Sequence, residues 1–169
     1  MIKIGDTLPA VALAEYVEVA GEGCSIGPNA VKLPEALAGK TIALFAVPGA
    51  FTPTCSEKHV PGYVAKADEL KAAGVHEIWC VSVNDAFVMG AWGRDQKVAG
   101  KVRMIADGDA AFAKATGLTL DLNGKGLGLR ANRFSMLVKD GKVVTLNVEG
   151  PGKFEVSDAD TMLAQVKAA

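Results

Sequence analysis

The chain has little of what several specialised protein classes require. None of its apolar runs approaches the about 18–20 residues that a membrane helix needs. Its 18 basic and 19 acidic residues give a net charge of −1, and no basic arm or face stands out. Neither nucleic acid nor an anionic membrane is therefore expected as a partner. The first residues, MIKIGDTLPAVAL, also lack the charged, apolar and small-residue order of a secretory signal peptide.

Cysteine is scarce as well. The sequence contains three cysteines, Cys24, Cys55 and Cys80, an odd and small number for a disulfide framework in 169 residues. Cys55 is followed by Ser56, Glu57 and Lys58, so the C-x-x-C motif of a general disulfide exchanger is absent. We therefore expect a protein of a reducing compartment, the cytoplasm.

Motifs for several kinds of catalysis and for metal binding are also missing. There is no G-x-S-x-G, no Walker phosphate-binding loop and no H-E-x-x-H. The glycines at 124, 126 and 128 follow no predicted strand, which argues against a dinucleotide-binding fingerprint. Cys55 and His59 could share one helical face, but two ligands are too few for zinc. We expect neither a metal nor a bound cofactor.

What the sequence does contain is the alternation of a single α/β domain over residues 1–169. Strands are predicted at 11–20, 41–47, 75–83, 102–106, 134–138 and 143–147, and helices at 34–38, 55–73, 84–92, 109–116 and 157–168. Repeated crossovers through helices imply a central, mainly parallel sheet with an antiparallel edge hairpin, flanked by helices. A thioredoxin-like fold fits this order best.

Several local signals refine that prediction. Gly21-Glu22-Gly23 predicts the turn of an N-terminal hairpin, and Asp140-Gly141 predicts the turn of the C-terminal one. Pro61-Gly62 should kink or briefly break the helix 55–73. Residues 118–132 are expected to form a glycine-rich loop. Asn84-Asp85 is expected to cap the helix 84–92, and Ser157 to cap the last helix.

The stretch VPGAFTPTCS joins the predicted strand 41–47 to this helix. Pro48 and Pro53 restrict the loop, and the hydroxyls of Thr52 and Thr54 lie near the thiol of Cys55. The first turn of a helix presents free N–H groups and a partial positive charge, which favour the reactive thiolate. The alternative is a small buried apolar side chain, as many free cysteines are, and position alone does not decide between the two.

The residues around Cys55 do match a known family. PGAFTPTCSEKHVPGY resembles the active-site segment of the peroxiredoxins, in particular the peroxiredoxin-5-like or type II subgroup. The family signature of a proline, a threonine four residues later and the peroxidatic cysteine three residues after that corresponds to Pro48, Thr52 and Cys55. The likeness continues through VSVNDAFVMGAW, KVRMIADG and GLGLRANRFSMLVKDGKV, and so covers most of the chain from about Leu44.

The resemblance implies a thiol peroxidase that needs neither metal nor cofactor. Arg133 in RFSM matches the arginine that faces the cysteine in the family, whereas Arg130 occupies a neighbouring basic position with no assigned role. Hydrogen peroxide or an alkyl hydroperoxide would sit between the Thr52 hydroxyl, the Cys55 N–H and Arg133. The Cys55 thiolate would become a sulfenic acid, which Pro48 would shield. A peroxide sensor or chaperone-like redox protein with little turnover is the alternative, and a thiol–disulfide oxidoreductase is a third.

The thiol that completes the cycle stays open. Animal members of the subgroup carry a cysteine near the C-terminus, but LNVEGPGKFEVSDADTM has none. Cys80 matches the second cysteine of plant type II members, yet its apolar strand IWCVSV predicts a buried position that only local unfolding would open. An external thiol, either glutathione with glutaredoxin or thioredoxin, is at least as good a candidate, and Cys24 is a third. The resemblance also favours a homodimer with Phe51 and Trp92 as contacts, unless both aromatics are core residues.

Overall fold

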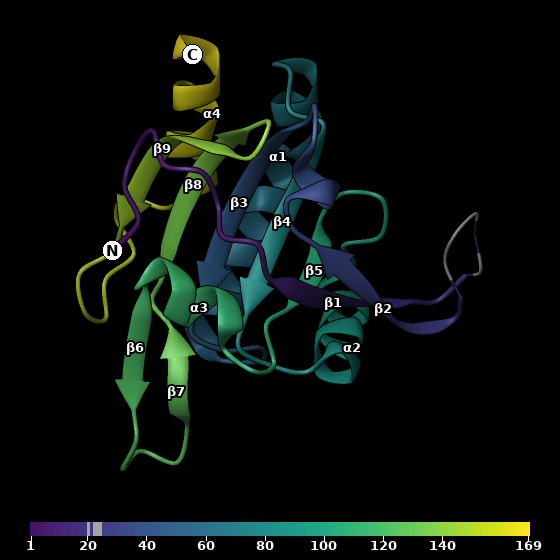
Figure 1. Cartoon of the computed structure of the whole chain (residues 1–169), viewed down its shortest axis with the longest axis vertical. Coiled ribbons are helices and arrows are strands. Elements are labelled where there is room, and N and C mark those ends of the chain that lie inside the picture. The colour runs from purple at the N-terminus through teal and green to yellow at the C-terminus, as the bar shows by residue number, and fades with distance from the viewer. Residues whose placement is uncertain (20, 22–24) are drawn as a thin grey trace.

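The computed structural model describes residues 1–19, 21 and 25–169 and has a seven-stranded sheet at its centre (Figure 1). The strands are β1 (Ala12–Val17), β2 (Gly27–Lys32), β3 (Thr41–Val47), β4 (Glu77–Ser82), β5 (Arg103–Ala106), β8 (Phe134–Lys139) and β9 (Lys142–Val148), in the order β2-β1-β5-β4-β3-β8-β9. The central strands β5, β4 and β3 are parallel, and antiparallel strands border them on both sides. The thioredoxin-like α/β fold is thereby confirmed, with its edge hairpin β8–β9.

Helices cover both faces of this sheet. The helical elements are η1 (Glu35–Leu37), η2 (Cys55–His59), α1 (Val60–Ala72), α2 (Ala86–Gln96), α3 (Ala111–Thr116) and α4 (Ala159–Ala168). Buried side chains of α1, α2 and α4 form one core cluster, and those of α3, η1 and the N-terminal segment form the other. Figure 1 shows α1 behind β3 and β4, and α3 on the near face.

Strand β3 separates the two clusters because its side chains alternate between them. Phe45 belongs to the cluster under α1, whereas Leu44 belongs to the cluster under α3. Every residue from Ile42 to Val47 is buried, as expected for a strand covered on both faces. The chain leaves the carboxyl end of β3 and enters helix almost at once, so the intervening loop lies at the edge where α/β proteins place their chemistry.

The prediction of a loop at residues 118–132 is wrong, because this segment folds as a second, two-stranded sheet. Its strands are β6 (Thr119–Leu122) and β7 (Gly128–Ala131), which pair antiparallel. The alternation of apolar and polar residues in TLDL extends over only four residues. The surrounding glycines therefore favoured the prediction of a loop. Those glycines serve the connecting turn, where Gly124 and Gly126 adopt positive φ angles that other residues rarely tolerate.

Two predictions about helix ends also need correction. The irregularity expected at Pro61-Gly62 lies one turn earlier, in the π-helical turn η2, and α1 continues through Pro61. Pro61 is the second residue of α1 and lies just after this π-helical turn, an irregularity that a residue without an N–H favours within a continuous helix. The cap of α4 is Asp158, whose carboxylate accepts from the Thr161 N–H, and not Ser157.

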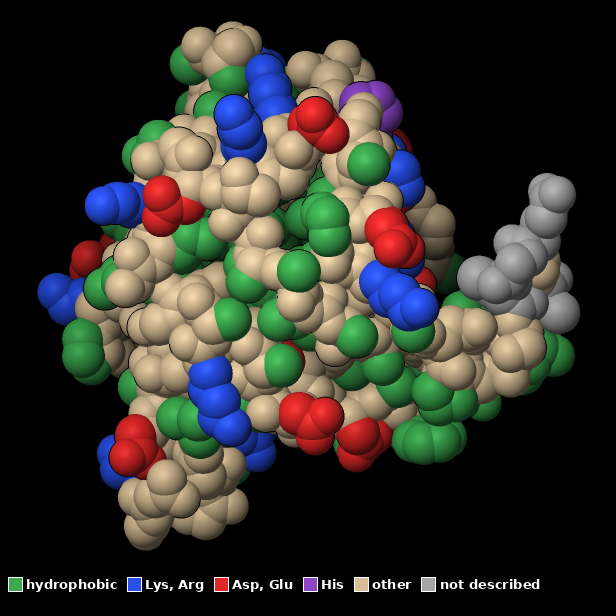
Figure 2. All heavy atoms as spheres, viewed as in Figure 1, with side chains coloured by type: hydrophobic (Ala, Val, Ile, Leu, Met, Phe, Trp, Pro, Cys, Tyr) green, Lys and Arg blue, Asp and Glu red, His purple; other side chains and the backbone are tan. Residues whose placement is uncertain are grey.

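Other local predictions hold. Asp85 caps α2 by accepting from the Val88 N–H, and β1 and β2 form the N-terminal hairpin. Glu22, Gly23 and Cys24, on which the predicted turn and one cysteine assignment depend, lie outside the described residues. In the part of the chain that is described, no helix is long and apolar enough to cross a membrane. Figure 2 shows basic and acidic side chains interspersed over one face, without a field of either sign.

Candidate active site

Cys55 is fully buried in the first turn of the helix that follows β3. Helical backbone begins at Pro53, a position where proline loses no hydrogen bond. The Ser56 N–H donates to the Thr52 carbonyl over 3.0 Å and closes the first turn. Because the first N–H groups of a helix have no partner within it, they present a partial positive charge beside the Cys55 thiol. This placement suits a thiolate.

The loop before Cys55 is tied down from two sides. On the inner side, the Ala50 N–H donates to Asn84 Oδ1 over 3.0 Å, and Ser82 Oγ donates to the same oxygen over 2.6 Å. Within the loop, Thr52 Oγ1 donates to the Gly49 carbonyl over 2.7 Å. Since that bond uses the hydroxyl hydrogen, the lone pairs of Thr52 Oγ1 remain available to accept a hydrogen bond.

Arg130 holds the outer side of this loop. Its Nη1 donates to the Pro48 carbonyl over 3.3 Å, and its Nε donates to the Leu127 carbonyl over 2.7 Å. A Cβ at Gly49 would lie 2.9 Å from Arg130 Nη1, so a larger residue here would displace the Arg130 side chain that holds the Pro48 carbonyl. Phe51 is 54% exposed and has a φ of 63°, an uncommon value for an aromatic residue. The loop is therefore held in one conformation by residues of β7 and the β4–α2 connection.

Arg133 brings a positive charge directly to the sulfur. It lies just before β8, which neighbours β3, and its side chain is largely buried. Nη2 donates to Cys55 Sγ over 3.1 Å, and Nη1 donates to His59 Nδ1 over 2.9 Å. A guanidinium has no basic lone pair, so both contacts are donations and the sulfur is the acceptor. A buried cation at this distance stabilises the thiolate over the thiol.

His59 is the acceptor that fixes the other arm of Arg133. Its Nε2 lies 3.0 Å from the Ser157 carbonyl, which can only accept, so Nε2 carries the proton and Nδ1 is the free lone pair. Burial, and then the charge of Arg133, lower the pKa of His59 to about 3. His59 is consequently neutral and locked in one tautomer. Among the described residues no group of three or more His, Cys, Asp or Glu side chains is placed to hold a metal ion.

Ser157 presents its carbonyl to a second donor as well. Tyr63 Oη donates to it over 3.0 Å, and the Tyr63 ring stacks on Phe45 with 4.0 Å between centroids. Burial raises the pKa of Tyr63, which therefore stays a neutral donor. Two neutral side chains thus converge on one backbone oxygen of the loop before α4.

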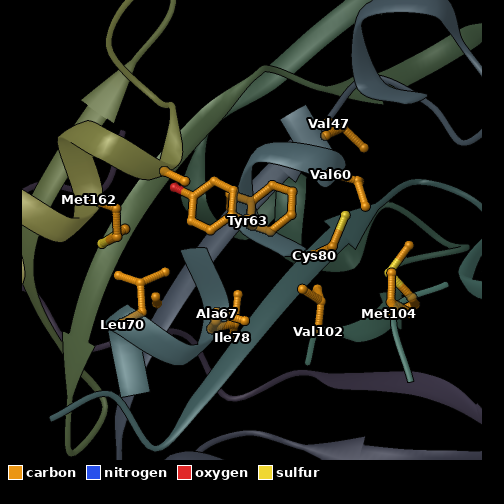
Figure 3. Close-up of a cluster of buried hydrophobic side chains, with 14 of the residues drawn as sticks. Val47, Val60, Tyr63, Ala67, Leu70, Ile78, Cys80, Val102, Met104 and Met162 are labelled. Atoms are coloured by element: carbon orange, nitrogen blue, oxygen red, sulfur yellow. The ribbon is translucent and has the colours of Figure 1, made fainter. Parts of the chain in front are cut away.

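Cys80 lies in β4, on the side of the sheet that faces Cys55. It is fully buried, and both cysteines belong to the core cluster under α1. Figure 3 shows Cys80 among Val60, Val102 and Met104. Burial raises the pKa of Cys80, and a negative charge on Cys55 raises it further while Arg133 opposes the shift. Cys80 is therefore a protonated thiol within the core, in a strand paired on both sides.

Sequence reasoning found some of these residues and missed others. Of the predicted site residues, Arg133 contacts Cys55, and Pro48 and Thr52 lie in the loop that precedes Cys55. Asn84 appeared in the sequence only as part of a helix cap, and nothing marked Ser157 as a partner of His59. Trp92, a suggested dimer contact, is instead fully buried, where its Nε1 donates to Ser56 Oγ over 3.1 Å.

Comparison with known proteins places these residues in context. Residues 3–163 match the Redoxin family. Peroxiredoxin-2B of Arabidopsis thaliana is 56% identical over 126 residues, which cover 75% of this chain and 78% of that protein. Peroxiredoxin-2D of the same plant is 44% identical over 162 residues, 96% of each chain. The crystal structure of reduced Prx3 in complex with hydrogen peroxide from Vibrio vulnificus superimposes with a TM-score of 0.90 at 51% identity, covering 98% of this chain and 99% of that one.

Proposed function

The chain belongs to the Redoxin family as a peroxiredoxin, a thiol peroxidase similar to the type II members, and we propose the roles of its residues on that premise. The contact that carries the proposal is the 3.1 Å hydrogen bond from Arg133 Nη2 to Cys55 Sγ. It joins a buried cation to a buried thiol at a helix N-terminus, a combination that favours a nucleophilic sulfur.

In the first step, the Cys55 thiolate attacks the terminal oxygen of a hydroperoxide. The S–O bond forms as the O–O bond breaks, so the sulfur is oxidised by two electrons to a sulfenic acid and the peroxide is reduced. The leaving oxygen departs with the electron pair and takes a proton from solvent, which yields water or an alcohol. Cys55 is the nucleophile, and no metal or cofactor takes part in the proposal.

The fixed donors and acceptors around Cys55 suit this step. Thr52 Oγ1 has a lone pair free to accept from the O–H of the attacked peroxide. Arg133 and the first-turn N–H groups donate to the oxygen on which negative charge grows, and they are already in place before reaction. Pro48, fixed through its carbonyl by Arg130, covers the site and limits further oxidation of the sulfenic acid.

The comparisons support hydrogen peroxide as one substrate. The similar Prx3 of Vibrio vulnificus has been crystallised with it, and we extend this substrate, together with alkyl hydroperoxides, to the present chain.

The reductant in this proposal is an external thiol. A second thiolate attacks the sulfenic sulfur and expels hydroxide, which leaves as water, and a further thiol then reduces the disulfide. Cys80 would have to leave a paired central strand to reach Cys55, whereas a small thiol such as glutathione needs only the loop side to open. We therefore favour glutathione with glutaredoxin, or thioredoxin, in a reducing compartment such as the cytoplasm.

A homodimer is also part of the proposal. Phe51 beside the site and Phe87 on α2 are large apolar side chains that remain exposed in the single chain, and both suit burial against a second copy.

Peroxide consumption by the wild type, Cys55→Ser and Cys80→Ser tests the assignment of Cys55 as the nucleophile. With glutathione and glutaredoxin present, Cys55→Ser should abolish turnover, whereas Cys80→Ser should keep it because Cys80 takes no part in the first step. Full activity in Cys55→Ser would refute the mechanism. A wild-type protein that reacts with peroxide once but is not turned over by either thiol system would instead favour the sensor function.

A further inference from the structure

Glu149 is a buried carboxylate that the proposed mechanism does not use. It directly follows β9 and is 4% exposed, and no Lys or Arg side chain pairs with it in the described part of the chain. An isolated buried charge is costly unless hydrogen bonds compensate it, so the surroundings of Glu149 call for explanation.

The carboxylate of Glu149 is surrounded by donors from one loop. The N–H groups of Glu155, Val156 and Ser157 donate to it over 2.9 Å, and Ser157 Oγ donates over 2.7 Å. Burial raises the pKa of Glu149, but these hydrogen bonds outweigh burial and hold the pKa below its ordinary value. The ionised side chain thus takes the place of a strand or helix in satisfying the backbone of residues 155–157.

Both the backbone of Glu149 and the loop that its carboxylate binds contact residues of the active site. The Glu149 N–H donates to the Arg133 carbonyl over 3.0 Å, which joins the two backbones. In the loop that Glu149 organises, the Ser157 carbonyl accepts from His59 Nε2, and the other ring nitrogen of His59 accepts from Arg133. Phe154 of the same loop packs on the His59 ring at 4.9 Å and lies 5.9 Å from the Arg133 guanidinium carbon.

We propose that Glu149 is a positioning residue of the peroxidase: it folds residues 150–158 so that Ser157 orients His59, and His59 in turn holds the Arg133 guanidinium against Cys55 Sγ. Glu149 contacts neither the thiol nor the peroxide site and acts through the loop alone. This inference rests on the proposed function, because it assigns Glu149 to the Arg133–Cys55 pair of that reaction.

A purely structural role for Glu149 makes a different prediction. If Glu149 only stabilised the fold, its replacement would lower the free energy of unfolding and leave the chemistry of Cys55 in the native state unchanged. If Glu149 positions Arg133, its replacement loosens Arg133 even in molecules that remain folded, and so reduces the fraction of Cys55 present as thiolate. The thiolate absorbs ultraviolet light that the thiol does not absorb, so it can be followed without any peroxide.

The variant that separates these roles is Glu149→Gln. The amide keeps the shape of the side chain but turns an NH₂ group toward a cluster of N–H donors and removes the charge. Glu155→Gln makes the same chemical change on an exposed side chain of the same loop. Val31→Ala, in β2 and in the other core cluster, serves as a destabilised control remote from the loop. Ser157→Ala is a milder second variant, which deletes only the hydroxyl donor to Glu149.

The measurements are the thiolate absorbance at pH 7, taken as the difference from Cys55→Ser in each background, the rate of Cys55 oxidation by hydrogen peroxide, and urea unfolding. We expect Glu149→Gln to lose thiolate absorbance and to react about 10- to 100-fold more slowly, the range that small misplacements of catalytic groups produce. Ser157→Ala should change both quantities in the same direction by less, and Glu155→Gln and Val31→Ala should keep wild-type values.

The outcomes of this experiment separate the inference from the function on which it rests. Wild-type thiolate absorbance and rate in Glu149→Gln would overturn the positioning role, and so would losses no greater than those of Val31→Ala. If Glu149→Gln does not fold, Ser157→Ala decides: unchanged absorbance and rate would overturn the proposal. A wild-type protein whose Cys55 is not oxidised by peroxide would instead refute the proposed function, whatever the variants do.

Discussion

Replacing Arg133 with methionine removes the cation that the structure places on the reacting sulfur. Arg133 Nη2 lies 3.1 Å from Cys55 Sγ, and the charge centre of the guanidinium is farther away, about 4 Å for a typical contact of this kind. At an effective dielectric constant of about 20, two unit charges at that separation attract by about 4 kcal/mol. This sets an upper estimate, because water that enters the site replaces part of the lost interaction.

We expect the variant Arg133→Met to lose about 3 kcal/mol of transition-state stabilisation. That corresponds to about a 100-fold slower second-order reaction of Cys55 with hydrogen peroxide, in line with the loss of one oxyanion donor in other enzymes. Stopped-flow fluorescence is a suitable assay, because the indole of Trp92 donates a hydrogen bond to Ser56, the neighbour of Cys55, and so senses changes at the site.

Two further variants control this experiment. Arg133→Lys keeps the charge, but a single ammonium cannot reproduce the planar fork that reaches both Cys55 and His59, so we expect an intermediate rate. Arg94→Met removes an exposed arginine paired with Glu18 and should leave the rate unchanged. A folded Arg133→Met protein within threefold of the wild-type rate would refute the reasoning.

Three other predictions concern the same site. Thr52→Val should slow peroxide reduction by about 10-fold or more in steady-state assays at equal thermal stability, because it removes an acceptor for the substrate while keeping the side chain's shape. His59 resists protonation when folded, with a pKa of about 3, but binds a proton when unfolded near pH 6.5, so stability should fall as the pH drops through this window. Between pH 6.5 and 5 the loss is about 2 kcal/mol in urea unfolding, and it should vanish in His59→Asn but persist in His76→Gln, where the histidine is exposed. Cys80→Ser, treated with peroxide and then glutathione, should show one glutathione on Cys55 by mass spectrometry, as should the wild type; a Cys55–Cys80 disulfide in the wild type would show that the core opens to form it.

Much of the fold could be predicted because its signals are local. The buried strand β3 is a continuous apolar run, and Asp85 and Asp140-Gly141 mark a helix start and a hairpin within a few residues. The hairpin β6–β7 was missed because its strands are only four residues long and partly exposed, so the glycines of its turn outweighed the alternation. Ser157 does not cap α4 because the helix begins one residue later than predicted, which puts Asp158 at the cap position, while the Ser157 hydroxyl donates to Glu149, eight residues earlier.

The candidate site was predictable to the extent that it is contiguous. Pro48, Thr52 and Cys55 fall within eight residues, so a motif carries them together. Arg133 is 78 positions from Cys55 in the sequence, and only the resemblance to the peroxiredoxins supplied it. The tautomer of His59 depends on the Ser157 carbonyl, 98 positions away, for which no sequence signal exists.

The rate at which hydrogen peroxide oxidises Cys55 tests most directly whether Cys55 is the nucleophile of a peroxidase. Stopped-flow mixing of the reduced protein with hydrogen peroxide at pH 7, with Cys55→Ser as the blank, gives the second-order rate constant. Mass spectrometry of the product then locates the added oxygen. We expect a reaction far faster than that of free cysteine, with one oxygen added to Cys55. A rate constant no greater than that of free cysteine would contradict this assignment.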